Sequence, residues 1–100
     1  MKEDEIVKKL KKIIKNSNVF YEKFFDGFHY TTTFHVITDK FSVYFKIDDE
    51  ILLNNETSIT VQHIIKSYEY NMYSEVFNTK EYNKLLEEGD PNAKWNIFNT

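Results

Sequence analysis

Histidine side chains are the groups in this chain that most readily bind a metal ion or transfer a proton near neutral pH. His29 and His35 fall in one segment rich in aromatic and β-branched residues, and we expect them on the same face of a strand. At about 3.3 Å per residue they are then roughly 20 Å apart, too far to share a metal ion. His63 falls in a different element. We therefore predict no metal site and no cofactor, with His29 opposite Asp48 as a weak ion pair.

Other catalytic groups lack the neighbours that their chemistry requires. A nucleophilic serine requires a base and an orienting group, and no serine here lies in a glycine-flanked turn. The chain has only two glycines, too few for a phosphate-cradling loop, and no cysteine. The carboxylate pairs Asp48/Asp49 and Glu87/Glu88 fall in a turn and at a helix end, where water reaches them. We predict that the protein is not an enzyme.

The composition indicates one folded domain. The chain has 100 residues, of which 41% are hydrophobic, so we expect a single compact domain over 1–100. No stretch approaches the roughly 20 apolar residues of a membrane span. The N-terminal segment is charged and has no leader-like apolar block, which favours a cytoplasmic protein, either in a bacterium or in an infected host cell.

The elements that position these groups begin with an amphipathic helix. Apolar residues recur with helical spacing, and lysines occupy the remaining positions. Acids precede the lysines, as the helix dipole favours, and residues 16–18 end the helix. The predicted buried positions are Ile6, Val7, Leu10, Ile13 and Ile14.

Three strands follow, at 19–25, 28–37 and 41–48. Asp26-Gly27 is a strong signal for a two-residue hairpin loop, and we assign a second such loop to Thr38-Asp39. The second loop lacks glycine, so a longer loop is an alternative there, and 19–24 can also extend a helix. With two-residue loops, Val19 lies opposite Phe34. One sheet face is then apolar and the other is mixed and largely polar.

The remaining segments predict helices on the apolar face. Residues 48–50 form an acidic turn, and 51–53 are short and apolar enough for a fourth, edge strand. A helix begins at Thr57 or Ser58, and a shorter one follows Asn78 and ends before Gly89. The predicted inward residues of these two helices are Val61, Ile64, Ile65, Tyr68, Met72, Tyr82, Leu85 and Leu86. The fold class is therefore α+β: a helix, a three-stranded antiparallel meander and two helices packed on one sheet face.

An aromatic stripe on the second of these helices raises a question about partners. At about 100° per residue, Tyr70, Tyr73 and Phe77 fall opposite the core stripe. Either the last helix and the apolar tail at 95–98 cover them, or a partner does. Acids surround this stripe, since 69–90 contain six acids against two lysines.

Charge is unevenly distributed along the chain. Residues 1–15 carry six lysines and three acids, whereas 16–100 carry seven lysines and 13 acids. All 13 basic residues are lysines, so bidentate recognition of phosphate or guanine by arginine is excluded. The lysine-rich first helix either contacts nucleic acid or forms a solvated helix face, and we favour the solvated face.

The order of these elements resembles that of small phage-encoded anti-CRISPR proteins. The segments that carry the resemblance are DEIVKKLKKI, HVITDKFSVYFKIDDE, ITVQHIIKSYEYN and TKEYNKLLEEG. The likeness is one of organisation over most of the chain. It implies a stoichiometric inhibitor, a DNA mimic that presents carboxylates where a CRISPR effector nuclease or another nucleic-acid enzyme expects phosphates.

We accordingly expect a small binding protein that contacts a protein partner through an acidic and aromatic surface. Two alternatives are a homodimeric assembly module, joined through the open sheet face or the aromatic stripe, and a nucleic-acid binder that uses the first helix. The predicted partner contacts are Asp48, Asp49, Glu50, Glu69, Tyr70, Tyr73, Glu75, Glu81, Glu87 and Glu88.

Overall fold

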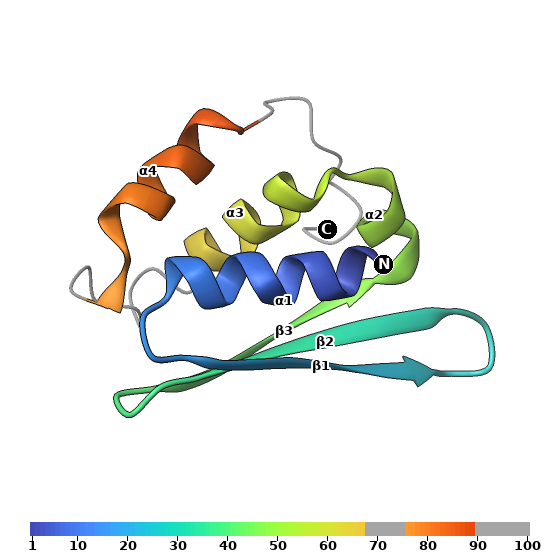
Figure 1. Cartoon of the computed structure of the whole chain (residues 1–100). Helices are drawn as coiled ribbons and strands as arrows, with labels where there is room; N and C mark the ends of the chain where they lie inside the picture. Colours follow the sequence, from blue (N-terminus) through green and yellow to red (C-terminus); the bar gives the residue numbers. More distant parts are fainter. Residues whose placement is uncertain (68–75, 90–100) are drawn as a thin grey trace.

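A three-stranded antiparallel sheet carries helices on one face in the computed structural model, which describes residues 1–67 and 76–89 (Figure 1). The elements are α1 (Lys2–Ile13), β1 (Asn18–Phe25), β2 (Tyr30–Ile37), β3 (Ser42–Asp48), α2 (Asp49–Asn54), α3 (Thr57–Ser67) and α4 (Thr79–Glu87). Strand β2 lies between β1 and β3. The predicted α+β class and the three-stranded meander are confirmed.

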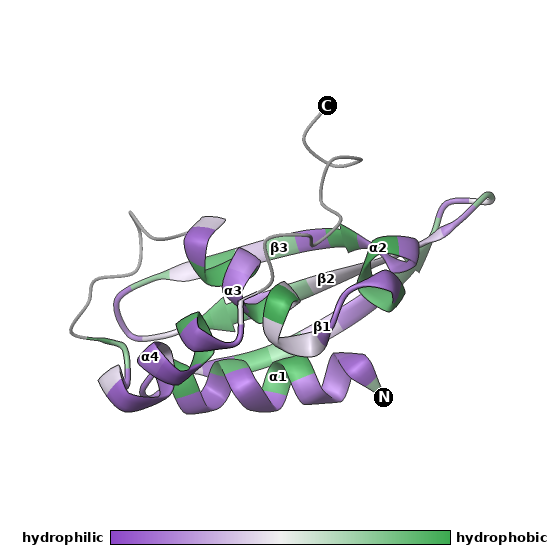
Figure 2. Ribbon diagram, turned by 90° about the horizontal axis from the view of Figure 1, so that it is seen from above, coloured by the Kyte–Doolittle hydropathy of each residue, from purple (hydrophilic) through white to green (hydrophobic). Residues whose placement is uncertain are grey.

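Helix α1 lies along the sheet with its apolar face inward (Figure 2). Ile6, Leu10 and Ile14 are completely buried, as the spacing predicts, and the exposed lysines cover the outer side. Asn16 ends the segment with a φ of 55°, in the left-handed region that asparagine tolerates better than most residues. The predicted first helix is confirmed.

The sheet sorts its side chains by alternation, so that one face is apolar. Val19, Phe34, Val36 and Ile47 are at most 2% exposed and pack under the helices. Successive residues of a strand point to opposite faces, so the residues between them reach the open side of the sheet. The strand interpretation of 19–25 is correct, and the alternative helical extension is wrong.

The register differs from the predicted one by two residues. Val19 pairs with Val36, where two-residue loops would place Phe34. Both loops contain four residues, 26–29 and 38–41, so the prediction of two-residue loops is wrong. His29 therefore lies in a turn and not in the strand. Because the shift is an even number, every side chain stays on its predicted face, and the core is unaffected.

A side-chain oxygen at the first position stabilises each four-residue loop. The Asp26 carboxylate accepts hydrogen bonds from the backbone amides of Phe28 and His29 at 2.8 and 2.9 Å. The Thr38 hydroxyl accepts from the amides of Lys40 and Phe41, both at 3.2 Å. Such turns need no left-handed pair of central residues, which explains why the second loop forms without glycine.

The segment after β3 is a helix and not the predicted edge strand. Asp48 is the N-cap of α2, and its carboxylate accepts a hydrogen bond from the Glu50 amide at 2.9 Å. The acids of the predicted turn thus occupy the first helical turn, where the helix dipole stabilises them. Ile51 and Leu52 are buried while Leu53 is 65% exposed, which the alternation of a strand does not produce.

Helices α3 and α4 complete the covered side. Val61, Ile64 and Ile65 are buried as predicted, while Tyr68 and Met72 lie outside the described residues. Helix α4 packs on α1 and α3, so it lies farther from the sheet (Figure 1). Leu85 is buried, but Leu86 is 40% exposed and its predicted inward position is wrong. Helix α4 follows Asn78, as predicted, and this N-cap residue makes no side-chain cap hydrogen bond.

Two phenylalanines at opposite extremes of burial test this core. We expect Phe34→Ala to lower the free energy of unfolding by about 3–5 kcal/mol, because it leaves a cavity. The matched variant Phe28→Ala removes a side chain that is 92% exposed and should change stability by no more than about 0.5 kcal/mol. Urea unfolding followed by circular dichroism measures both, and equal losses would contradict the assigned burial.

Candidate protein-binding end of the sheet

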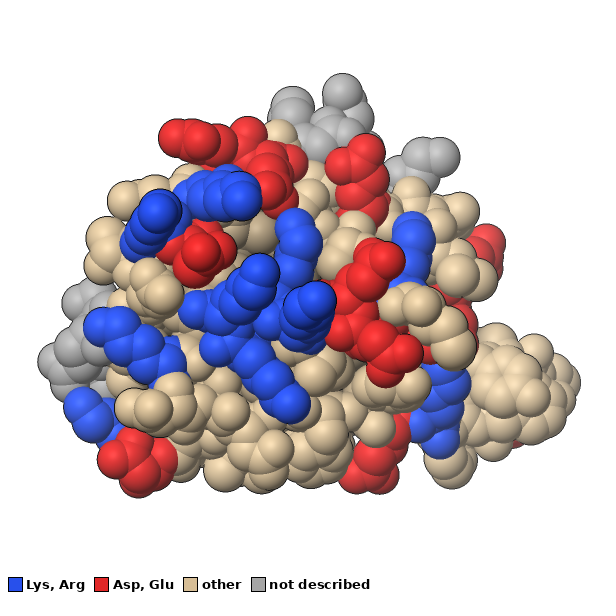
Figure 3. All heavy atoms as spheres, in the orientation of Figure 1, with Lys and Arg blue, Asp and Glu red and all other residues tan. Residues whose placement is uncertain are grey.

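Four aromatic side chains are exposed at the end of the β1–β2 hairpin. Phe28 is 92% exposed, Phe24 61%, Tyr30 54% and Phe25 51%. This end of the hairpin extends past the helices and forms the projecting lobe in Figure 3. Monomeric proteins seldom leave clustered large apolar side chains in water unless they bind a partner. We call these four residues the aromatic tip.

The aromatic tip arises because the strands are longer than the helix layer that covers them. Phe25 and Tyr30 continue the apolar face of the sheet, but they extend beyond the helices and are half exposed. Their rings pair across the strands with centroids 4.7 Å apart. Phe24 lies on the opposite face, and Phe28 lies in the turn. Aromatic surface is therefore presented on both sides of the hairpin end.

Carboxylates surround the aromatic tip. The amides of His29 and Phe28 donate to the Asp26 carboxylate and hold the pKa of Asp26 below its ordinary value. The His29 ring lies between two acids, with Nδ1 3.5 Å from Asp26 and Nε2 3.3 Å from Asp48. The expected proximity of His29 and Asp48 is confirmed. Glu50, the second residue of α2, is exposed. This end of the molecule thus combines aromatic and acidic side chains.

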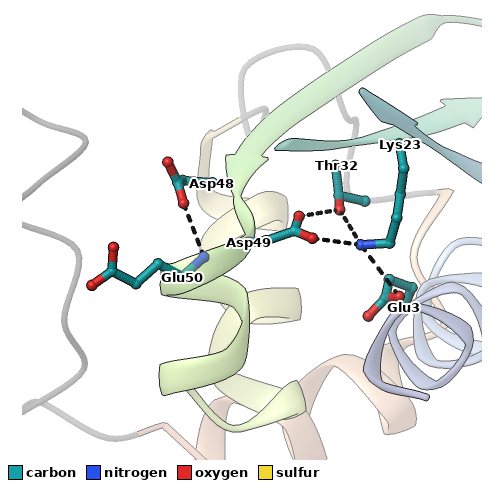
Figure 4. A network of polar contacts seen from close by, with 6 residues as sticks. All are labelled: Glu3, Lys23, Thr32, Asp48, Asp49 and Glu50. Carbon is teal, nitrogen blue, oxygen red and sulfur yellow. Dashed lines mark hydrogen bonds and ion pairs between the residues drawn. The ribbon is translucent and has the colours of Figure 1, made fainter. Parts of the chain in front are cut away.

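Asp49, although it is next to Asp48 and Glu50 in the sequence, points toward Lys23 and Thr32 of the sheet (Figure 4). Its carboxylate accepts hydrogen bonds from Lys23 Nζ at 2.8 Å and from Thr32 Oγ1 at 2.7 Å. Lys23 also donates to Thr32 Oγ1 at 2.9 Å and lies 3.4 Å from the Glu3 carboxylate. These four residues, which we call the Lys23 network, come from α1, β1, β2 and α2. Asp49 therefore has a partner within the fold, and its predicted role as a surface contact stays untested.

The Lys23 network keeps its lysine charged. Burial lowers the pKa of Lys23, but the hydrogen bonds and charges of Asp49 and Glu3 outweigh burial, so the pKa is raised. A raised folded pKa gives stability that is present below the unfolded value and lost only as the pH rises through the folded value. The contribution is therefore complete at neutral pH. The Glu3 carboxylate depends on Lys23 for a neutralising charge, because the Glu3 side chain is only 6% exposed.

The predicted acidic contacts are divided between two regions. Asp48 contacts His29 beside the aromatic tip and Glu50 follows it in α2, whereas Glu81, Glu87 and Glu88 lie on or directly after α4, at the other end of α1 (Figure 1). Glu88 is partly neutralised by Lys9 Nζ at 3.0 Å. Four further predicted contacts lie outside the described residues: Glu69, Tyr70, Tyr73 and Glu75.

Phe77, the described member of the predicted aromatic stripe, belongs to the core. It is 6% exposed, and its ring stacks on Tyr82 of α4 with centroids 4.9 Å apart. Phe77 also forms an isolated β-bridge with Ile14. The last helix therefore covers this part of the stripe, as one of the two alternatives predicts. The tail at 95–98 lies outside the described residues.

The described residues include one small cleft between two helices. A cleft between α1 and α4, lined in part by Lys12 and Lys84, has a volume of about 90 Å³. Ligand sites usually measure about 300–1,000 Å³, so this cleft accommodates only a few water molecules. Within 1–67 and 76–89, no three histidine, aspartate or glutamate side chains gather into a group that could hold a metal ion.

Lysines gather over α1, in the middle of the face shown in Figure 3. Lys8, Lys11, Lys12 and Lys15 are all exposed. Acidic side chains of α4 and of the first turn of α1 flank them. This mixed surface is typical of a solvated helix face, and neighbouring acids oppose the binding of a phosphate backbone.

No protein-family model, curated protein or solved structure matches the chain. The resemblance to anti-CRISPR proteins therefore stays a prediction. Among the helices of residues 1–67 and 76–89, none has the length and apolar character required to cross a membrane.

The sequence interpretation missed the aromatic tip, although a signal was present. The letters FFDGF place three phenylalanines around a turn, and alternation assigns Phe24 and Phe25 to opposite faces. Aromatic residues on both faces next to a turn indicate that at least one of them extends beyond the core.

Removal of the central cation tests the Lys23 network. We expect Lys23→Met to lower the free energy of unfolding by about 2 kcal/mol, because it leaves Glu3 and Asp49 without their counter-ion. Lys46→Met is the matched control, since Lys46 is exposed on β3, and should cost less than about 0.5 kcal/mol. Urea unfolding at neutral pH measures both, and an equal cost for the two variants would refute the structural role of Lys23.

The pH dependence of stability tests the environment of His63. Its ring packs edge-on against Phe45 at 5.5 Å, and burial lowers the pKa of His63 from 6.5. Between the lowered folded pKa and the unfolded pKa, the unfolded state binds more protons, so stability decreases as the pH falls. We expect the wild-type Tm to drop between about pH 7.5 and pH 5, and His63→Gln to reduce that drop. Calorimetry of both proteins across this pH range measures the decrease in Tm. Identical decreases for the two proteins would exclude His63 as a cause of the pH dependence.

Proposed function

We propose that this chain is a small, non-enzymatic binding protein that contacts a protein partner through the aromatic tip. The observation that carries the proposal is the exposure of Phe24, Phe25, Phe28 and Tyr30 at one projecting end of the fold. Aromatic residues concentrate at the centres of protein interfaces, because they bury a large area with few rotatable bonds. A hairpin end of this shape fits into a pocket or groove of the partner.

Charge supports a partner with a basic rim. Asp26 and Asp48 contact His29 beside the aromatic tip, and the exposed Glu50 follows Asp48 in α2, while Lys23 is held by Asp49 and Glu3. A basic rim around an apolar groove complements this arrangement and speeds association by electrostatic steering. Basic grooves are typical of enzymes that act on nucleic acids.

The finer proposal is therefore a phage or mobile-element inhibitor of a nucleic-acid enzyme, as the resemblance implies. One of the predicted acids, Asp48, contacts His29 beside the aromatic tip, and a second, Glu50, follows it in α2; both support the proposal. The acids of α4 lie elsewhere, so a continuous mimic of a DNA backbone receives less support than an aromatic hairpin with an acidic border.

Site-specific photo-cross-linking tests the proposed contact. A benzophenone amino acid replaces Phe28 in the full chain, and a matched variant carries it in place of Lys11, which is exposed on α1. After irradiation in the cells that carry the gene, we expect a covalent adduct with one protein at position 28 and not at position 11. Mass spectrometry identifies the adduct, and the purified pair then provides the affinity and its salt dependence.

Two further variants connect the adduct to the aromatic and acidic side chains. Phe24→Ser, introduced into the chain that carries benzophenone at position 28, should weaken binding to the partner by about tenfold or more while the fold is retained. Glu50→Lys should slow association, and the effect should shrink at high salt. Equal adducts at both positions, or none at position 28, would reject the proposed surface. Inhibition of the captured partner's nuclease activity tests the finer proposal separately.

A further inference from the structure

The open face of the sheet carries its side chains in rows that cross the three strands. The register places Phe20 of β1, His35 of β2 and Tyr44 of β3 side by side. Two residues further along, Glu22 and Lys46 occupy the two edge strands with Thr33 between them. The helices of residues 1–67 and 76–89 cover the opposite face (Figure 1). These two rows, one aromatic and one charged, form the central part of the open face.

The aromatic row is large and partly ordered within the monomer. The Phe20 and His35 rings stack with centroids 4.6 Å apart and an interplanar angle of 12°. The Tyr44 ring lies 6.4 Å from His35 on the other side. Tyr44 remains 64% exposed and Phe20 38% exposed. A flat aromatic surface of this kind gains free energy when a second flat surface covers it.

The charged row carries one acid and one base, so it complements a second row in which the two charges are exchanged. Glu22 and Lys46 are both exposed, and the two strands that carry them are roughly 9.6 Å apart. Glu22 contacts His35 at 3.3 Å, but its side chain stays 69% exposed and free to turn outward. The row thus presents a negative charge at one edge and a positive charge at the other.

We propose that two copies of the chain pack open face to open face, about a two-fold axis that runs nearly parallel to β2. This axis exchanges the two edge strands. Glu22 of each copy then faces Lys46 of the other, and Phe20 faces Tyr44 of the other. Thr33 lies at the axis and faces itself. Two ion pairs and two aromatic contacts form at once, which makes the surface self-complementary.

Other two-fold arrangements of the same faces are less favourable. An axis across the strands through Thr33 would place Glu22 against Glu22 and Lys46 against Lys46, and like charges in an interface cost several kcal/mol. An axis perpendicular to the sheet does not bring the open faces together. The arrangement along β2 also matches the common packing of two sheets, with their strands about 30° apart and the layers about 10 Å apart.

The size of the face predicts a weak dimer. Three strands of about eight residues cover roughly 14 by 27 Å, or about 400 Å² per copy. Standard stable interfaces bury about 800 Å² per partner, so dissociation is expected in the micromolar to millimolar range. Because the axis keeps the strand direction, Phe25, Phe28 and Tyr30 of both copies would lie at the same end of the dimer, whereas Phe24, on the open face, would face Asp48 of the other copy. The inference extends the proposed function, since it makes the binding end bivalent, but it does not depend on it.

A charge exchange tests the dimer and its axis. Sedimentation equilibrium from micromolar to millimolar concentration measures the association constant of the wild-type chain. We expect Glu22→Lys and Lys46→Glu each to lower that constant by about tenfold or more, because each substitution acts twice in a symmetric dimer. The double variant, with both substitutions, should return to within about threefold of wild type. A monomeric wild type at every concentration, or no rescue in the double variant, would overturn the proposal.

A cysteine variant tests the position of the axis independently, since the chain has no cysteine of its own. Thr33→Cys places one thiol on the axis, and Lys11→Cys places one on the exposed side of α1 as a control for collisions. With a short bifunctional thiol reagent, we expect covalent dimers from the Thr33 variant at least about fivefold faster than from the Lys11 variant. Equal rates would exclude the proposed axis, and circular dichroism confirms that both variants are folded.

Discussion

The fold depends on one cation held between two carboxylates. Lys23 joins β1 to α1 through Glu3, and to α2 through Asp49, with Thr32 of β2 as a further ligand. This contact fixes the helix layer to one end of the sheet. On the covered face of β1, Val19 is buried and Tyr21 packs against the core, whereas Phe25, beyond Lys23 on the same face, is half exposed. The same network that closes the core therefore sets the point at which the hairpin leaves it.

Much of the fold was accessible from the sequence, because alternation decides which face each residue occupies. The first helix, the three strands and the buried residues of α3 follow from periodicity alone. The register was not accessible in the same way. Loop length depends on whether a side chain such as Asp26 or Thr38 bonds the next amides, and a shift of two residues changes no face. The helix after β3 was predictable in principle, since Asp48 is a good N-cap and two acids follow it.

The candidate site was less predictable, for a physical reason. A count of acids in the sequence treats every carboxylate as available to a partner. In the structure, however, Asp49 is held by Lys23 and Thr32, and Glu88 pairs with Lys9. Periodicity also cannot state where one layer ends and another continues. Phe25 has the spacing of a core residue, yet it is half exposed because the strands run past the helices. To predict where the strands extend past the helices, one must know the relative lengths of elements that are far apart in the sequence.

Asp48 joins the sheet to the helix layer without an intervening loop. It is the last residue of β3 and the N-cap of α2, and it also contacts His29 of the turn. Little conformational entropy remains for the aromatic end to lose on association, because its acidic border is already fixed by the backbone. In the proposed complex, the free energy of contacts to this acidic border would go into affinity and not into ordering the border.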